Sequence, residues 1–557
     1  MSDERKGARP RCRSPGLLRL VSLLHGAAAA FLLAATPVEG ARPCVRYAPL
    51  AMSLSSDIRS TDPGVNRDSN TDVVLMHVVE GLVGSREDGS PAPLLAARIE
   101  TSPDGRLYRF FLRRDVHFHN GALLTSADVL WSWQRYLNPK TGWLCLPQFD
   151  GSHGARIVSI KAPSPDVVVF ELDRAQPMFL AQMATVTCGG SPILHSSSVN
   201  ADGTWRAPIS TGPYRFASAK PGDYVDLSAF KDYTPRAEPP DGYTGRKVAY
   251  APTIRFIIIR DAAARIAALM KGQIDVMTEL TTPDIRRLQH VQSVHIVSAP
   301  GGTVNAILIQ SRDSLLADVR IRRALQLSID RRSVTLLSTA GTGQINASMV
   351  PASSPYHDAI HATQTSVNIP LARQLLSEAG YKGEPITLTT NRRFTDLFDQ
   401  ALLVQAMARK AGIDIRLDVT EWATQVNRYQ NGHYQLMSFN YSARPDPFFN
   451  YEAMLGDRTL SARKVWTDPA AIRLLDAVGS EAVPKKRQLI LDRLHRDMLD
   501  EVPLIVLFNP ADVNGVRANL IGFRAWSLGR ARLWDVKKVA HEGRAPDSRR
   551  ASSVPCR

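Results

Sequence analysis

The sequence has no long apolar run and few cysteines. None of its continuous apolar stretches reaches the roughly 20 residues that a membrane-spanning helix needs, which excludes a protein with several membrane spans. The chain contains five cysteines in 557 residues, and no two of them have the C-x-x-C spacing of common zinc sites. We therefore expect no zinc site of that kind.

Signatures of catalysis are also missing. The chain has no G-x-S-x-G nucleophile elbow, no H-E-x-x-H zinc motif, no G-x-x-x-x-G-K-[ST] phosphate loop and no G-x-G-x-x-G. His117 and His119 would share one face of a strand and could hold a metal. No third ligand is evident, and we favour a structural pair beside the Asn120-Gly121 turn. The sequence indicates a binding protein without catalytic residues, metal or cofactor.

The charge is positive but dispersed. Lys and Arg (68) outnumber Asp and Glu (53), which gives a formal net charge of +15. No basic patch interleaved with aromatic residues occurs, so nucleic-acid binding is not expected. At about 150 residues per domain, the length allows three or four domains or one large interleaved body.

Residues 1–40 have the pattern of an export signal. Basic residues precede an apolar stretch at 20–35, and Val38 and Gly40 then occupy the −3 and −1 positions of a cleavage site before Ala41. The alternative is an uncleaved anchor, for which the apolar stretch is short. We therefore expect a periplasmic protein whose mature chain starts near Ala41.

Export also bears on the cysteines. Cys12 would leave with the signal, and an oxidising compartment permits a disulfide among the others. Cys145 with Cys188 is the pairing that we expect, and buried free cysteines are the alternative.

Strand and helix patterns alternate along the rest of the chain, which predicts a mixed α/β fold. Thr125 and Asp128 have the T-x-x-D spacing of a helix start. A helix over 262–271 would end at Gly272. Residues 319–337 carry apolar side chains every four positions, which predicts one further helix.

Short motifs follow one another along the chain. They include Glu80-Gly81-Leu82-Val83, Ser102-Pro103-Asp104-Gly105, Thr125-Ser126-Ala127-Asp128-Val129, Ser210-Thr211-Gly212-Pro213-Tyr214, Ile274-Asp275-Val276, Asp318-Val319-Arg320, Ile329-Asp330-Arg331 and Glu378-Ala379-Gly380-Tyr381. In this order, over about 45–535, they resemble the family-5 extracellular solute-binding proteins, the peptide and nickel receptors of bacterial ABC importers.

The resemblance implies an α/β fold of the type II periplasmic-binding-protein kind, a clamshell of two lobes with an extra inserted subdomain. Lobe I would be discontinuous (41–87, 207–300 and 500–540), the inserted subdomain would span 88–206, and lobe II would span 301–499. The ligand would lie in the cleft between the lobes. The partners would be the ABC permease and ATPase subunits at the inner membrane, and we expect a monomer. Residues 541–557, rich in Gly, Pro, Ser and Arg, are expected to be a disordered tail.

One segment departs from the family's pattern. In peptide-binding members, a strand that ends in an aromatic residue leads to an aspartate that holds the ligand's α-ammonium, and D-P follows. Here Tyr441 falls at the aromatic and Asp446-Pro447 at the D-P, but Arg444 stands at the aspartate. Because an arginine fork suits carboxylate or phosphate, we expect Arg444 to contact an anionic ligand group. The alternatives are an Arg444–Asp446 pair, a solvated arginine, or an ammonium held by Asp446.

The resemblance indicates three further cleft residues. Arg392 or Arg393 follows a predicted strand, in a loop that supplies a carboxylate-binding arginine in dipeptide-binding relatives, and a solvated charge is the alternative. Trp422, like Tyr441, is a candidate apolar wall, with core packing as the alternative.

These observations predict a periplasmic receptor that delivers a short peptide or peptide-like solute to an ABC importer. A carboxylate-rich non-peptide solute, opine-like or a sugar acid, is the second candidate. A secreted hydrolase with an unrecognised site and an envelope chaperone are the remaining alternatives.

Overall fold

The computed structural model describes residues 47–152 and 154–538. The expected export signal, its cleavage near Ala41 and the expected tail (541–557) lie outside these residues. Within the described ranges, no helix has the length and apolar character to cross a bilayer. Strands and helices alternate along the chain, which confirms the predicted mixed α/β class.

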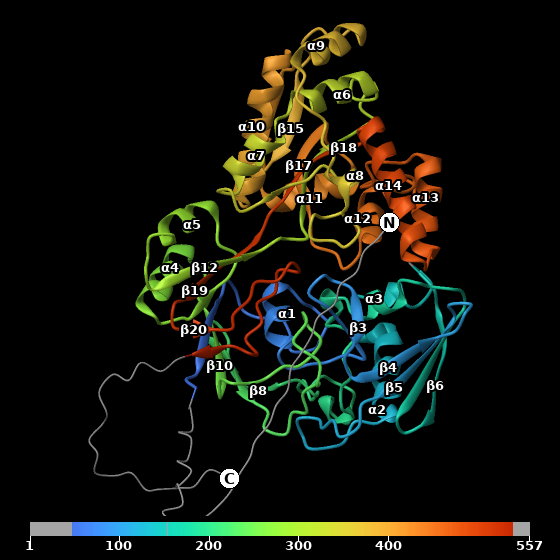
Figure 1. Ribbon diagram of the computed structural model, residues 1–557, viewed down its shortest axis with the longest axis vertical. Helices are drawn as coiled ribbons and strands as arrows, with labels where there is room; N and C mark the ends of the chain where they lie inside the picture. The colour runs from blue at the N-terminus through green and yellow to red at the C-terminus, as the bar shows by residue number, and fades with distance from the viewer. Residues whose placement is uncertain (1–46, 153, 539–557) are drawn as a thin grey trace, which may run out of the picture. The chain divides into compact units, whose positions relative to one another are not determined.

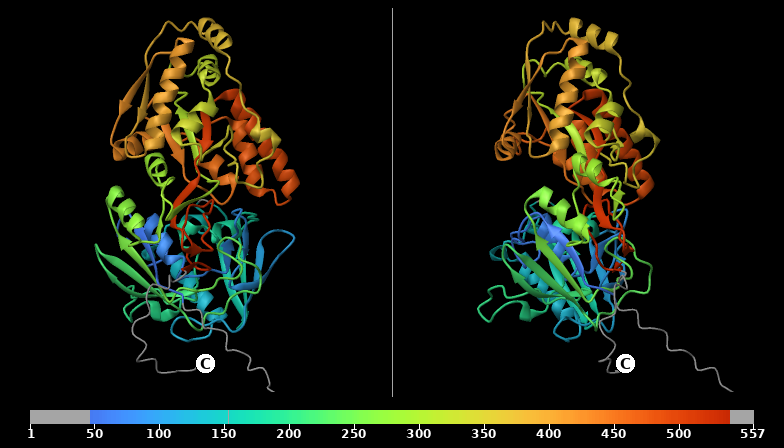
Figure 2. Two further views of the ribbon diagram at one scale, coloured as in Figure 1. Left: turned by 60° about the vertical axis from the view of Figure 1, so that its left-hand side comes forward. Right: turned by 90° about the vertical axis from the view of Figure 1, so that its left-hand side faces the viewer.

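The first large sheet has seven strands. In sheet order they are β12 (Val294–Ala299), β19 (Asp512–Arg517), β11 (Val276–Met277), β1 (Leu50–Leu54), β10 (Thr253–Ile258), β9 (Tyr224–Ala229) and β8 (Tyr214–Lys220). β1 pairs in parallel with both β10 and β11, and helix α4 (Ala262–Lys271) crosses over between these two. The side chain of Asp261 accepts from the N–H of Ala264, and Gly272 ends the helix with a φ of 72°, so the predicted helix is confirmed. Helix α5 (Thr282–Leu288) lies beside it (Figures 1 and 2).

The second large sheet has six strands. In sheet order they are β14 (Gln344–Ile345), β18 (Leu504–Asn509), β13 (Val304–Ile309), β17 (Leu436–Tyr441), β15 (Ile386–Thr390) and β16 (Ile415–Val419). β13 and β18 are buried along their whole length, as expected of inner strands. The helices of this part are α6 (Val319–Ser328), α7 (Arg331–Ser338), α8 (Ala359–Ala362), α9 (Ile369–Glu378), α10 (Thr395–Ala411), α11 (Trp422–Asn431), α12 (Pro447–Met454), α13 (Pro469–Ser480) and α14 (Pro484–Glu501).

The single helix predicted over 319–337 is wrong. The chain forms two helices, α6 and α7, separated at Ile329 and Asp330. Asp330 has extended backbone angles, and its carboxylate accepts from the N–H groups of Arg332 and Ser333. A capping aspartate starts a new helix at this point. The apolar period continues across the break, so the sequence pattern predicted a single helix.

A third sheet has four strands. In sheet order they are β4 (Ala96–Thr101), β5 (Leu107–Leu112), β7 (Val167–Leu172) and β6 (Ile157–Ser164). Helix α2 (Ser126–Leu137) packs against it, and the predicted Thr125–Asp128 capping box is present at its start. Trp133 of α2 is fully buried and lies edge-on to Phe149 and Phe170. Smaller elements nearby are α1 (Ser69–Leu75), β2 (Val83–Ser85), β3 (Pro91–Pro93) and α3 (Phe179–Met183).

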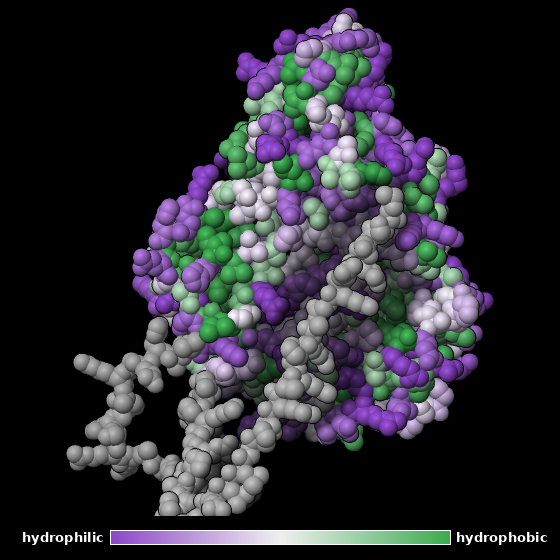
Figure 3. Space-filling model, in the orientation of Figure 1, coloured by the Kyte–Doolittle hydropathy of each residue, from purple (hydrophilic) through white to green (hydrophobic). Residues whose placement is uncertain are grey.

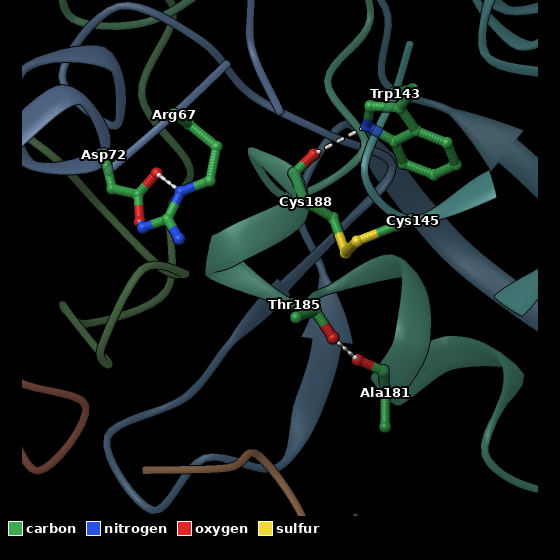
Figure 4. The surroundings of a disulfide bond; sticks show 7 residues. All are labelled: Arg67, Asp72, Trp143, Cys145, Ala181, Thr185 and Cys188. Atoms are coloured by element: carbon green, nitrogen blue, oxygen red, sulfur yellow. Dashed lines mark hydrogen bonds and ion pairs between the residues drawn. A yellow bond between two sulfur atoms is a disulfide. The ribbon is translucent and has the colours of Figure 1, made fainter. Parts of the chain in front are cut away.

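Cys145 and Cys188 form a disulfide in the structure, with their Cα atoms 5.6 Å apart. Both residues are buried in the apolar core around α2. The indole N–H of Trp143 donates to the Cys188 carbonyl at 3.2 Å, as Figure 4 shows. The bond therefore ties two loops of this core together.

We expect mass analysis of the purified chain under non-reducing conditions to find no alkylatable thiol at Cys145 or Cys188, because both sulfurs are engaged and buried. Reduction in denaturant should release both. Two alkylated cysteines without reductant would contradict the bond.

The chain passes between the two large sheets at two adjacent places. β12 ends at Ala299 and β13 begins at Val304, while β18 ends at Asn509 and β19 begins at Asp512. Ala299 pairs with Asp512 across β12 and β19. A Cβ atom at Gly301 would lie 1.9 Å from the carbonyl oxygen of Pro510, so only glycine allows this close approach.

These crossings bear on the expected lobes, whose division remains a prediction. Residues 500–540 were expected in lobe I, yet β18 pairs with β13 of the six-stranded sheet and only β19 joins the seven-stranded one. The sheets therefore favour a lobe boundary near residues 510–511.

A buried ion pair lies in the part of the chain that contains the seven-stranded sheet. The Lys247 ammonium lies 2.8 Å from Glu80, and both side chains are fully buried. Tyr233 and Thr211 also donate to the Glu80 carboxylate, at 3.0 and 3.1 Å. Burial lowers the pKa of Lys247, and the charge of Glu80 opposes this shift. The Glu80 carboxylate is thus the ion-pair partner of Lys247.

The surface mixes residue types. On the face drawn in Figure 3, hydrophilic residues are spread widely rather than gathered into one patch. This agrees with the dispersed charge of the sequence.

Candidate functional site

A cavity of about 460 Å³ opens where distant chain segments meet. Its size lies within the range of small-ligand sites. Residues from five segments line it: Asp88, Ser90 and Pro91; Pro177, Met178 and Ala181; Ser354, Pro355 and Tyr356; Pro445, Asp446 and Pro447; and Pro484, Lys485, Arg487 and Gln488. We call it the proline-walled cavity.

Prolines dominate the wall of this cavity. Six of its sixteen lining residues are prolines, and two of them, Pro447 and Pro484, occupy the first positions of α12 and α14. Because the proline ring fixes φ, these positions lose little further freedom when a ligand binds. The wall is therefore largely preformed.

Asp446 is committed to structure. Its carboxylate accepts from Arg487 at 2.7 and 2.5 Å and also accepts from the N–H of Phe448 at the start of α12. Burial alone would lower the pKa of Arg487, but the hydrogen bond and the charge of Asp446 outweigh it and raise that pKa. The partner of Asp446 is therefore Arg487 and not Arg444, and both carboxylate oxygens are occupied.

Arg487 also joins two parts of the wall. Its guanidinium lies 5.0 Å from the ring centre of Tyr356 and 3.3 Å from the sulfur of Met178. Because Met178 belongs to the expected inserted subdomain and Arg487 to the expected lobe II, this contact connects the two.

Arg444 lies at the wall of a smaller neighbouring cavity of about 70 Å³, which it shares with Thr185, Thr187 and Phe449. Pro445 lines both cavities. Within residues 47–152 and 154–538, Arg444 makes no ion pair and no hydrogen bond. The residue keeps an exposed surface, although desolvation of its guanidinium lowers its pKa, with Glu452 opposing. Arg444 is therefore a cation without an ion-pair partner among the residues that the structure describes.

Two further charges lie at the edge of the proline-walled cavity. Asp88 accepts from the N–H and the hydroxyl of Ser90, at 2.8 and 2.6 Å. Neither Asp88 nor Lys485 forms an ion pair with any residue that the structure describes, and both are exposed. The cavity edge therefore offers one carboxylate and one ammonium to a ligand.

Tyr441 and Trp422 lie in the core of the part that contains the six-stranded sheet. Tyr441 is only 4% exposed and contacts Phe439, with ring centres 5.5 Å apart. Trp422 is partly buried and lies 5.0 Å from Phe394. Neither lines the cavities described above, and their surroundings favour core packing.

Arg392 and Arg393 are exposed in the loop between β15 and α10. Their guanidinium groups lie 4.5 Å from the ring centre of Phe398 and 5.6 Å from that of Phe394. Neither lines the proline-walled cavity. The structure therefore brings Arg444 and Asp446 together at the cavities and leaves the two loop arginines apart from them.

Sequence reasoning missed Arg487. Its position carried a signal, because residues 487, 491, 494 and 498 fall on one face of α14 and the other three are Leu491, Leu494 and Met498. An arginine on an apolar helix face needs a buried partner. The sequence pattern could have indicated that Arg487 has a buried partner, but it could not have identified Asp446 as that partner.

His119 has a structural role. Its Nε2 lies 3.0 Å from the Gly212 carbonyl, and desolvation lowers its pKa to about 4. This supports the structural interpretation of the His117–His119 pair.

The comparisons with known proteins all find solute-binding proteins. The model of the bacterial extracellular solute-binding proteins, family 5, matches residues 90–461. The dipeptide-binding protein of Escherichia coli is 24% identical over 494 residues, which cover 84% of this chain and 89% of the relative.

Solved structures show the same fold. The substrate-binding protein CtaP of Listeria monocytogenes superposes with a TM-score of 0.77 at 19% identity, over 89% of this chain and all of that one. The periplasmic binding protein AgaA of Agrobacterium tumefaciens, solved with agropinic acid, gives 0.68 at 22% identity over 89% and 99% of the two chains. These matches confirm the predicted type of fold.

Proposed function

Because the chain belongs to the family-5 bacterial extracellular solute-binding proteins, the non-enzymatic substrate-binding proteins of ABC importers, we propose that it binds a short peptide or peptide-like solute. The ligand would occupy the proline-walled cavity and be delivered to the permease and ATPase subunits at the inner membrane. The chain would act as a monomer.

The observation that carries this proposal is the set of charges around the cavities. Asp88 offers a carboxylate to a ligand ammonium, and Lys485 and Arg444 offer cations to a ligand carboxylate. A peptide has both terminal charges, and charge-assisted bonds to both fix its orientation. A cavity of about 460 Å³ suits a ligand of two or three residues.

A carboxylate-rich non-peptide solute is the second candidate. Two cations without an ion-pair partner in the described chain, Arg444 and Lys485, stand against one such carboxylate, Asp88. Among the relatives, one protein is named for dipeptides and another was solved with agropinic acid. The excess of positive charge favours this alternative over a neutral ligand.

Mass spectrometry of the solute that co-purifies with the protein, followed by calorimetric titration, tests the proposal. We expect saturable one-to-one binding of di- or tripeptides. N-acetylation and C-amidation should each weaken binding about tenfold or more, because each removes one charge-assisted bond. An effect of amidation alone, with tight binding of a sugar acid or opine, would favour the second candidate. No binding of either class would overturn both.

We also propose that the chain is exported and cut near Ala41, on the signal pattern of residues 1–40. N-terminal sequencing of protein from the periplasmic fraction should start within a few residues of Ala41. Protein that still begins at Met1 in that fraction would contradict cleavage.

A further inference from the structure

A cluster of three histidines and two aspartates lies where α8 meets α14. The Nδ1 atom of His361 is 2.9 Å from a carboxylate oxygen of Asp358 and 3.9 Å from one of Asp492. One ligand atom from each of these residues lies within 4.8 Å of the other two. The ring centre of His495 is 5.0 Å from that of His361, and the ring centre of His357 is 5.9 Å from it.

The histidines of this cluster have unsatisfied nitrogens. His495 is fully buried, and neither of its ring nitrogens makes a hydrogen bond of acceptable geometry. His361 is also fully buried, and its Nε2 has no partner. Nearly all buried polar groups in folded proteins are satisfied. The two unsatisfied nitrogens of His495, beside the group of Asp358, His361 and Asp492, therefore point to a ligand.

The spacing is also suitable. In tetrahedral zinc sites with bonds of 2.0–2.1 Å, neighbouring ligand atoms lie about 3.3 Å apart. The Nδ1 atom of His361 would be the ligand atom here, and its distances of 2.9 Å to Asp358 and 3.9 Å to Asp492 bracket this value. The ligands come from two short patterns, His357 and His361 four positions apart and Asp492 and His495 three apart. Asp492 and His495 lie on one face of α14, whereas His357 precedes the start of α8.

We propose that Asp358, His361, Asp492 and His495, with His357 at the edge, form a binding site for a transition-metal dication of the Zn²⁺ type. Mixed imidazole and carboxylate ligands select such ions over Ca²⁺ and Mg²⁺. The Asp358 side chain is 40% exposed and gives the ion a path from solvent. The bound ion would join α8 to α14.

The site is distinct from the proline-walled cavity but touches its wall. Gln488 lines the cavity and donates to Asp492 at 2.8 Å and to Asp358 at 3.3 Å. Gln488 therefore orients both carboxylates, as outer-shell partners of metal ligands do.

The test uses the purified full chain without a polyhistidine tag, stripped with chelator and titrated with Zn²⁺ by calorimetry. We expect about one equivalent of bound zinc, verified by elemental analysis after dialysis, and a higher melting temperature with the ion than without it. Ca²⁺ and Mg²⁺ should produce neither effect. Co²⁺ in the same site should show the visible absorption of a low-coordinate nitrogen and oxygen site.

Three variants sharpen the test. His495→Gln should weaken Zn²⁺ binding at least tenfold, and so should Asp492→Asn, which keeps its shape and serves if the first variant does not fold. His290→Gln, at an exposed histidine outside the cluster, is the matched control and should bind like the wild type. Absence of Zn²⁺ binding, or equal affinity in all four proteins, would overturn the proposal.

Discussion

Replacing Lys247 with methionine is expected to lower the free energy of unfolding by about 3–5 kcal/mol, the usual cost of removing one partner from a buried ion pair. The substitution leaves the Glu80 carboxylate fully buried, and among the described residues its remaining donors are Tyr233 and Thr211. Neither of these groups carries a positive charge. The loss should appear as a lower midpoint in denaturant unfolding with an unchanged slope.

Two further variants decide whether the charge is responsible. Lys220→Met breaks an exposed pair between Lys220 and Asp223, whose side chains are 68% and 50% accessible, and should leave the unfolding midpoint close to that of the wild type. The double variant Glu80→Gln, Lys247→Met removes both charges and should cost less than the two single changes together. A loss below about 1 kcal/mol in Lys247→Met would show that the pair does not stabilise this part of the chain.

Arg444→Ala is expected to weaken ligand binding ten- to a hundredfold without unfolding the protein. Arg444 lies at the cavity wall, and its removal breaks no ion pair and no hydrogen bond among the described residues. A charge-assisted bond to a ligand carboxylate contributes about 1.5–3 kcal/mol, which corresponds to this loss in affinity. Calorimetric titration with the co-purified solute measures it, alongside melting curves.

Companion variants identify the anchor. Arg444→Lys should recover only part of the affinity, because the two-pronged fork is lost. Arg409→Ala, at an exposed arginine in the last turn of α10, is the matched control and should bind normally. If Arg392→Ala loses affinity and Arg444→Ala does not, the anchor lies in the loop between β15 and α10.

Local patterns predicted most single elements. The capping box at Thr125 and the glycine stop at Gly272 act within a few residues, and the structure has both. The break between α6 and α7 was missed because Asp330 interrupts the helix without interrupting the apolar period. At this point the capping side chain of Asp330 favours a new helix, whereas the apolar period favours a continuous one. The apolar period alone does not show which of the two forms.

The candidate site was harder to predict, because its contacts join distant residues. Asp446 and Arg487 are 41 positions apart, and nothing local to either indicates the other. Tyr441 and Trp422 illustrate the opposite difficulty, since an aromatic residue after a strand serves a core and a ligand wall equally well. The histidine cluster was equally hard to predict. Its residues come from two separate segments, around α8 and in α14, that lie side by side only in the folded chain.

The pairing of Ala299 with Asp512 shows how the two large sheets are connected along the chain. β12 and β19 are antiparallel neighbours paired up to these two residues, so topologically they form one β-hairpin. Everything from residue 300 to residue 511, including the six-stranded sheet, is the loop of that hairpin. A two-residue Asn-Gly turn would close the same hairpin without the loop. In topological terms, the entire six-stranded part is therefore an insertion at a single turn of the seven-stranded sheet.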